Sequence, residues 1–290
     1  MIIGIGEILW DNLPSGRRLG GAPANFAFHA GQLGMSSCVV SAVGKDCLGD
    51  EIKNKLGVLG VNYCITDVDS PTGKVIVNLD EHGVPAYDIC EGVAWDNIPF
   101  TDKVAILAKS ATVVCYGMLA QRNERSRETI YRFLKSVSSE CLKVFDVNLR
   151  QNYYNRHLIE ISLRFADVLK LNDEELNILK NLLNIEGRTE MELCCNVMNL
   201  YGVDIVVLTC GDRGSYVVSV DEVSYIETPK VEVVDTVGAG DAFTAAFVVA
   251  RQKGFNIKES HAMAVGVATS VCMADGATPK LPDEIISLFG

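Results

Sequence analysis

Short apolar runs alternate with longer amphipathic segments along almost the whole chain. The runs are too short for buried helices, and they have the near-continuous hydrophobicity of strands that are buried on both faces. They lie at residues 1–5, 38–42, 113–115, 144–146, 168–170 and 205–208. Helical spacing appears between them, at residues 20–34, 50–59, 125–137 and 190–200. This alternation predicts an α/β fold, with a central, mainly parallel sheet flanked by helices on both faces.

One region departs from this alternation. Apolar and polar residues alternate in the segment 72–87, and residues 80–83 supply a turn, so we predict a hairpin there. Residues 9–19 add a further strand or two. We interpret these segments as a small β lid, formed by about 9–19 and 63–95, on a single domain of residues 1–290. A hairpin at the edge of the main sheet is the alternative that the pattern leaves open.

Composition and charge narrow the classes of function. The chain has 290 residues, of which 48% are hydrophobic, and its formal net charge is -11, so a nucleic acid is not an expected partner. The first residues do not form a signal peptide, and no run of about 18 apolar residues predicts a membrane span. The cysteines show no metal-ligand spacing, which favours free thiols. We therefore expect a cytoplasmic protein with no membrane partner.

A glycine-rich turn near the C-terminus is the most informative local feature. Residues 231–234 have the pattern of a strand, and residues 242–253 have that of a helix ending at Gly254. The turn between them would place free N–H groups and the positive end of a helix dipole in position to bind a phosphate. Asp241, in the first helical turn, could accept a proton from an attacking hydroxyl. An aspartate that merely caps the helix fits the local pattern equally well.

Two common nucleotide motifs are missing from the sequence. No G-x-x-x-x-G-K-[ST] segment occurs, which argues against a P-loop. Gly4 and Gly6 are not followed by a third glycine at the required spacing, which disfavours an NAD-dependent oxidoreductase.

Two segments resemble a known family. The Gly238-Ala239-Gly240-Asp241 turn resembles the C-terminal signature of the ribokinase-type (PfkB) carbohydrate kinases. Residues 19–27, Leu-Gly-Gly-Ala-Pro-Ala-Asn-Phe-Ala, resemble the family's paired-glycine segment, which approaches the sugar. The resemblance spans nearly the whole chain and implies a ribokinase-like fold. It assigns Asp241 as catalytic base, and the amides of Gly238, Ala239 and Gly240 as an anion hole.

The resemblance also assigns residues to the sugar. Asp11, Gly20, Gly21 and Asn25 would bind its hydroxyls, although a turn residue and a helix-surface residue are the ordinary interpretations of Asp11 and Asn25. Arg150 ends a D-x-N-x-R segment similar to one seen in fructokinases and 2-keto-3-deoxygluconate kinases. It would steady the substrate or a phosphate, and a surface salt bridge is the alternative.

Two further segments resemble the family's nucleotide side, which implies ATP as the phosphate donor. Asn172 and Glu175 match an N-x-x-E motif that acts near Mg²⁺ and the ATP phosphates, with Glu175 reaching the metal through water. The same spacing is a capping box, which the sequence alone favours. Thr209, Gly211 and Gly214 match a T-x-G-x-x-G turn on the nucleotide side, a pattern also common at strand ends.

Members of this family often use K⁺. The resemblance places a monovalent cation near Asp235, Val237 and residues 274–280. Lys280 stands where other members carry a small residue. Its ammonium would replace the cation, which predicts activity without added K⁺, or it would point to solvent.

Several segments favour fructose, phosphorylated at its 6-hydroxyl, as the substrate. Residues 6–11, 20–25 and 145–150 are most similar to those of bacterial fructokinases, and residues 92–96 fit the same subgroup. Ribose, 2-keto-3-deoxygluconate and a nucleoside remain alternatives, as does a non-catalytic, kinase-like regulatory protein. The resemblance also implies a homodimer in which lids pack face to face, with Val75, Val77 and Leu79 on the apolar side of the contact. A cover over the sugar, or over the protein's own core, is the alternative role of these three residues.

Overall fold

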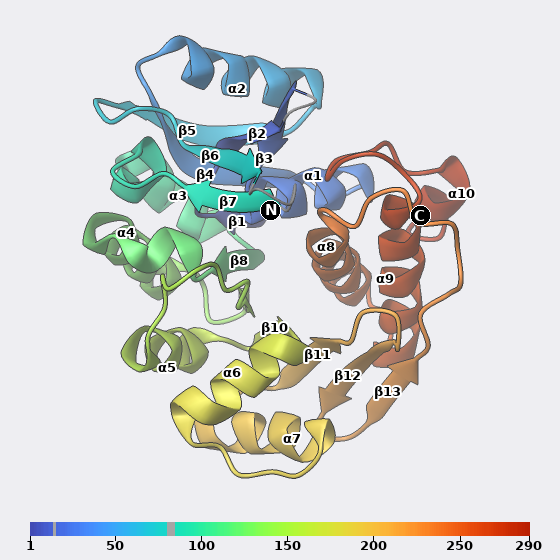
Figure 1. Cartoon of the computed structure of the whole chain (residues 1–290). Coiled ribbons are helices and arrows are strands. Elements are labelled where there is room, and N and C mark those ends of the chain that lie inside the picture. Colours follow the sequence, from blue (N-terminus) through green and yellow to red (C-terminus); the bar gives the residue numbers. More distant parts are fainter. Residues whose placement is uncertain (14–15, 80–84) are drawn as a thin grey trace.

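The computed structural model describes residues 1–13, 16–79 and 85–290. A nine-stranded sheet forms its centre, in the order β13-β12-β11-β10-β9-β8-β1-β4-β5 (Figure 1). Only β12 and β13 run antiparallel to their neighbours. The strands are β1 (Ile2–Ile5), β4 (Ser37–Gly44), β5 (Asn62–Val68), β8 (Val113–Gly117), β9 (Leu142–Asp146), β10 (Val168–Asn172), β11 (Ile205–Thr209), β12 (Ser215–Ser219) and β13 (Val223–Ile226). The predicted parallel sheet is confirmed.

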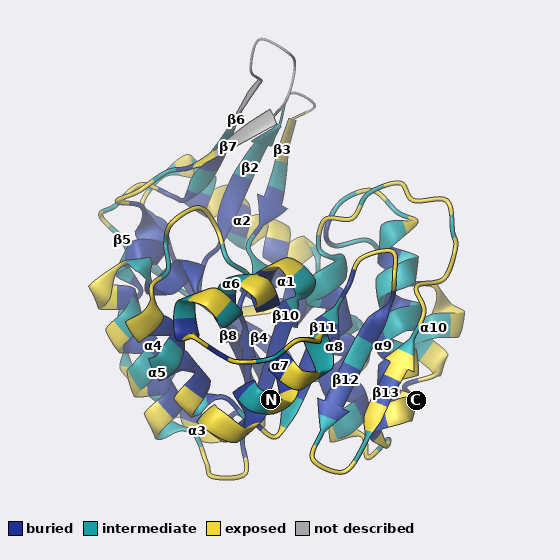
Figure 2. Cartoon of the chain, turned by 60° about the horizontal axis from the view of Figure 1, so that its bottom comes forward, coloured by how far each residue is buried: buried dark blue, intermediate teal, exposed yellow. Residues whose placement is uncertain are grey.

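Helices cover both faces of this sheet. One face packs against α1 (Ala22–Gln32), α2 (Cys47–Val58), α8 (Ala239–Gln252), α9 (Ile257–Cys272) and α10 (Asp283–Ser287). The other packs against α3 (Asp102–Ser110), α4 (Glu124–Ser136), α5 (Arg156–Phe165), α6 (Asp173–Leu183) and α7 (Glu190–Tyr201). Burial on both faces explains the apolar runs, and all eight residues of β4 are buried (Figure 2). Within the described ranges, no helix is long and apolar enough to cross a membrane.

A second sheet projects from the first (Figure 2). Its order is β3 (Gly16–Gly20), β2 (Leu9–Leu13), β6 (Lys74–Leu79) and β7 (Pro85–Ile89). β6 and β7 form the predicted hairpin, whose turn at residues 80–83 lies outside the described residues. The predicted lid range 63–95 starts too early, because β5 pairs with β4 in the main sheet.

The strand predicted at residues 231–234 is wrong. Val233 and Val234 are 57% and 61% exposed, and the segment runs as a loop in which the amide of Val234 donates to the carbonyl of Cys272. The antiparallel pair β12–β13 already forms this edge of the sheet, so alternating valines alone do not add a strand. The helix that follows begins at Ala239, three residues before the predicted start.

The topology marks one place for a ligand. From the central strand β1, the chain builds β4 and β5 on one side and β8 to β13 on the other. Such a reversal opens a crevice at the carboxyl ends of parallel strands. Polar residues meet there: Glu7 follows β1, Asp146 ends β9 and Asn172 ends β10.

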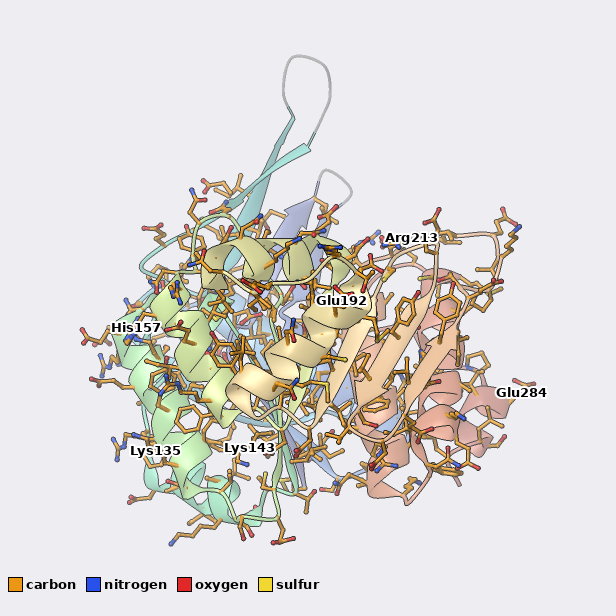
Figure 3. The ribbon with its side chains drawn as sticks, turned by 90° about the horizontal axis from the view of Figure 1, so that it is seen from below. Lys135, Lys143, His157, Glu192, Arg213 and Glu284 are labelled. Carbon is orange, nitrogen blue, oxygen red and sulfur yellow. The ribbon has the colours of Figure 1, made fainter. Side chains whose placement is uncertain are left out.

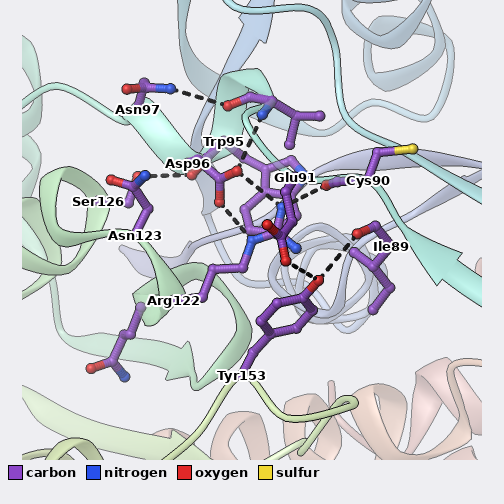
Figure 4. A network of polar contacts seen from close by, with 12 residues as sticks. Ile89, Cys90, Glu91, Trp95, Asp96, Asn97, Arg122, Asn123, Ser126 and Tyr153 are labelled. Carbon is purple, nitrogen blue, oxygen red and sulfur yellow. Dashed lines mark hydrogen bonds and ion pairs between the residues drawn. The ribbon is translucent and has the colours of Figure 1, made fainter.

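A buried network anchors the base of the second sheet (Figure 4). The Arg122 guanidinium donates to both oxygens of Asp96, at 2.8 and 2.9 Å, and to the carbonyl of Cys90, which directly follows β7. It also lies over the rings of Trp95 and Tyr153, 3.9 and 4.7 Å from their centroids. Paired and stacked in this way, Arg122 fixes where the second sheet leaves the main body.

Candidate active site

The start of α8 is built on glycine. Gly238, the N-cap, has φ 78°, and an added Cβ would lie 2.7 Å from Ala277, so only glycine fits there. No described side chain caps this helix end. The amide of Ala239 donates to the carbonyl of Thr236 at a long 3.3 Å. The first turn therefore presents the positive end of the helix dipole to the crevice.

Asp241, in this turn, meets a residue from the other end of the chain. The side-chain amide of Asn25, buried on α1, donates to Asp241 Oδ2 at 2.8 Å. Burial raises the pKa of Asp241 to about 7, and the negative Asp146 adds to this, whereas Asn25 and Lys170 oppose it. The structure thus brings together the two motifs that resemble the carbohydrate kinases. It contradicts the interpretation of Asn25 as a helix-surface residue.

Lys170 is a site residue that the sequence reasoning missed. It is buried, its ammonium lies 3.4 Å from Asp146 Oδ1, and a Cβ added to Gly240 would lie 3.1 Å from its Nζ. Burial works to lower the pKa of Lys170, but nearby Asp146, Glu175 and Asp241 together raise it above its ordinary value, so the group is charged. The available signal was a lysine inside an apolar strand, where an unpaired charge is costly.

Glu175 and Asn172 form the capping box at the start of α6, as the spacing favoured. The amide of Asn172 donates to Glu175 Oε2 at 2.9 Å, and Asn172 Oδ1 accepts from the amide of Glu175 at 2.8 Å. Glu175 Oε1 accepts from the amide of Leu149 at 2.8 Å, which ties the loop after β9 to α6. The buried carboxylate therefore has a structural role, and it still lies at the carboxyl edge of the sheet.

The T-x-G-x-x-G segment is the turn between β11 and β12. Thr209 ends β11, Gly211 has φ 57°, and a Cβ on Gly214 would lie 2.5 Å from the carbonyl oxygen of Ile226. The turn needs both glycines for these reasons alone. Arg213 within it donates to Asp173 Oδ2 at 2.9 Å, which links the turn to the start of α6.

The paired glycines Gly20 and Gly21 pack closely against Asp11 and Glu7. A Cβ on Gly20 would lie 2.3 Å from Asp11 Oδ2, and one on Gly21 would lie 2.5 Å from the carbonyl oxygen of Glu7. Burial raises the pKa of Asp11, and the positive charge of Arg150 opposes this rise. Arg150 likewise lowers the pKa of Asp241. Its charge thus acts on both the second sheet and α8, while its guanidinium donates a hydrogen bond to the carbonyl of Leu149.

Asp235 anchors the second sheet to the C-terminal region. Its Oδ2 accepts from Arg18 Nη1 at 3.2 Å and from the amide of Gly276 at 3.1 Å. Its Oδ1 accepts from the amide of Val237 at 3.0 Å. These bonds position the residues where the resemblance placed a monovalent cation.

The proposal that the Lys280 ammonium replaces that cation is wrong. The side chain is 84% exposed, and its ammonium lies 4.0 Å from the exposed carboxylate of Asp283. An ammonium that replaced a bound ion would have to turn inward and be coordinated. The expectation of activity without K⁺ loses its basis.

The carboxylates at this edge fit a particular kind of metal binding. In the described part of the chain, no three His, Cys, Asp or Glu residues gather as a ready-made metal site. Both carboxylate oxygens of Glu175 accept hydrogen bonds from backbone amides, and the carboxylate of Asp146 accepts from the Lys170 ammonium and the Thr244 hydroxyl. This donor set suits Mg²⁺ held mainly by phosphate oxygens and water.

Comparisons with known proteins agree with this geometry. The model of the pfkB family of carbohydrate kinases matches residues 16–284. An uncharacterized sugar kinase from Pyrococcus horikoshii is 29% identical over 99% of this chain and 94% of its own length. Its crystal structure in complex with ATP covers all of both chains with a TM-score of 0.85. A fructokinase from Klebsiella pneumoniae is 29% identical over 84% of this chain and 82% of its own. The chain therefore belongs to the pfkB family of carbohydrate kinases.

Proposed function

We propose that this protein transfers the γ-phosphate of ATP to the 6-hydroxyl of fructose. The observation that carries the proposal is the Asp241 carboxylate, held by Asn25 beside the uncapped start of α8. This arrangement places a proton acceptor next to an anion-binding helix end. Similarity to the Klebsiella fructokinase supports fructose as the sugar.

Asp241 would orient the attacking hydroxyl and take its proton. A phosphoryl group in transfer passes through a loose transition state, so the proton leaves late and a strong base is not needed. Burial holds the pKa of Asp241 at about 7, which keeps a substantial ionised fraction at neutral pH. Asn25 fixes the carboxylate through one oxygen and leaves the other for the hydroxyl.

The start of α8 would stabilise the negative charge of the transferring phosphoryl group. The amides of Gly238 and Gly240 belong to the turn at the positive end of the helix. The Lys170 ammonium lies close to Gly240 and adds a full positive charge on the same side. Ala239 contributes less, because its amide already donates to Thr236.

ATP would lie along the carboxyl edge from Asn172 and Glu175 towards Thr209, Gly211 and Gly214. Bound Mg²⁺ would neutralise charge on the phosphates that flank the breaking bond. Glu175 would reach it through water, because both of its carboxylate oxygens already accept backbone hydrogen bonds. A K⁺ ion near Asp235 belongs to the same proposal, and the dependence of turnover on added K⁺ tests it.

The second sheet would act as a lid that excludes water, since water competes with the sugar as acceptor. A dimer clasp through this sheet is a further part of the proposal. Val75 cannot contribute to it, because it is buried in the protein's own core. The structure describes only the backbone of Val77 and Leu79, so it assigns no role to their side chains. Light scattering tests the dimer, and a monomer at working concentration would remove it.

ADP release tests the function, with Mg-ATP and fructose, ribose, 2-keto-3-deoxygluconate, glucose or adenosine. Turnover mainly on fructose is the expected result. Turnover on another compound would keep the kinase mechanism and replace the sugar. If no compound gives ADP release, with or without K⁺, the proposed substrate range is overturned and a non-catalytic role is favoured.

A further inference from the structure

Glu7 lies at the carboxyl edge of the central sheet. It comes two residues after β1, the strand at which the sheet topology reverses, and it is 3% exposed. The preceding residue is held firmly: the amide of Gly6 donates to the carbonyl of Val40 at 3.1 Å, and the Ser41 hydroxyl donates to the carbonyl of Gly6 at 2.6 Å. The backbone thus fixes where the carboxylate lies.

A role at the start of α1 accounts for only part of the environment of the Glu7 carboxylate. The backbone amides of Glu7 itself and of Ala22 act to lower the pKa of this carboxyl, and Ala22 begins α1, whose N-cap Gly21 offers no side chain. Its Oε2 is buried and has no hydrogen-bond partner among the described residues. A buried polar atom without a partner is costly and needs a reason. A purely structural cap does not need this free oxygen.

A second free acceptor lies at the same site. Asn25 Oδ1 is also buried without a partner in the described part of the chain, while Asn25 Nδ2 binds Asp241. Burial raises the pKa of Glu7 to about 7; the charge of Asp241 adds to this and that of Arg150 opposes it. Glu7 is therefore within electrostatic reach of the catalytic carboxylate. Two acceptors near one carboxylate call for a ligand that brings several donors.

The chemistry of these acceptors selects the ligand. An anionic group would be repelled by Glu7 and Asp241 together. A hydroxyl can donate to each of these oxygens, and a sugar carries several at fixed spacing. We propose that Glu7 binds the substrate directly, its free carboxylate oxygen accepting a hydrogen bond from a sugar hydroxyl other than the one phosphorylated. This inference rests on the proposed sugar kinase function and names one of its specificity residues.

The test is Glu7→Gln, which keeps the size of the side chain and removes its charge. A hydrogen bond to a charged acceptor sets the expected effect, a rise of about 10- to 100-fold in the KM for the sugar. The KM for ATP should change little. Asp167→Asn is the matched control, because Asp167 also holds a backbone amide, that of Lys143, at 2.7 Å. Lys143 lies at the end of the molecule away from the second sheet (Figure 3).

Monodeoxy analogues of the sugar separate contact from mere support of α1. With wild type, one analogue should lose about 10- to 100-fold in kcat/KM because it lacks the donor to Glu7. With Glu7→Gln, the kcat/KM for that analogue should be similar to the kcat/KM for the parent sugar, because the variant has already lost this interaction. If Glu7→Gln does not fold, Glu7→Asp, which withdraws the charge by one methylene, should show the same pattern.

Each outcome has a distinct meaning. An unchanged sugar KM in the variant, or the same penalty for every analogue in variant and wild type, would overturn the role of Glu7 and leave the kinase function standing. Wild-type protein that turns over no sugar would overturn the proposed function, and this inference with it.

Discussion

Replacing Asp241 with Asn should lower activity and raise stability together. The amide keeps the shape of the carboxylate and can still accept a hydrogen bond from Asn25, but it cannot take a proton. A general base contributes about 10²–10⁴-fold, so kcat should fall by that factor. In wild type, kcat/KM should rise with pH up to about 7 and then level off, because only ionised Asp241 accepts the proton.

The gain in stability follows from the burial of the charge. The pKa of Asp241 rises from 3.8 in the unfolded chain to about 7, so ionisation favours the unfolded chain. The difference corresponds to at most about 4 kcal/mol, at 1.36 kcal/mol per unit. Above pH 7 the wild type carries the whole penalty, and below pH 3.8 it carries none. The free energy of unfolding should therefore rise by about 1–4 kcal/mol in Asp241→Asn at pH 8, and this gain should fade between pH 7 and 4.

Two assays test this reasoning. ADP release gives kcat, and urea unfolding at pH 8 and pH 5 gives the stability of both proteins. Asp102→Asn is the control, since Asp102 also lies in a first helical turn but is exposed. A kcat within a few-fold of wild type would refute the base, and lower stability at pH 8 would refute the argument from a buried charge.

Three further substitutions test the surroundings of the site. Glu175→Gln should lower the free energy of unfolding by about 1–3 kcal/mol, measured in urea, because a charged acceptor of backbone bonds is lost. Gly238→Ala should lower kcat about 100-fold by displacing the start of α8, whereas Gly254→Ala, also at positive φ but with open space, should leave kcat unchanged. Arg122→Ala should cost about 3–5 kcal/mol in unfolding, because it leaves Asp96 buried without its partner; a loss under 1 kcal/mol would contradict this.

Local periodicity was enough to predict the centre of the fold. Strands buried on both faces, such as β4, have nearly continuous apolar runs. It failed where pairing depends on distant residues. β5 is only partly buried, so nothing in its sequence shows that its partner is β4. The valines of residues 231–234 alternate like a strand, yet they find no partner strand.

Some residues of the candidate site could likewise be predicted from the sequence, and others could not. Asp241 and Asn25 were predictable because each belongs to a motif with fixed spacing, although their 2.8 Å contact was not. Glu7 and Lys170 are isolated polar residues beside or within apolar strands, and no spacing marks them. Their importance comes from burial and from their neighbours, which only the folded chain defines.

The charges at the carboxyl edge explain why these residues are held so firmly. Three acids lie at this edge together with the cations Lys170 and Arg150. Burial raises the pKa of each acid, namely Glu7, Asp146 and Asp241. Without ligands, this arrangement favours protonation and weakens the fold locally. In the proposed reaction, a sugar would supply donors for the free oxygens, and the metal ion bound with the nucleotide would bring positive charge near the acids. Ligand binding should thus relieve the electrostatic strain that the folded chain maintains by close packing, since a group that binds only the folded state stabilises it.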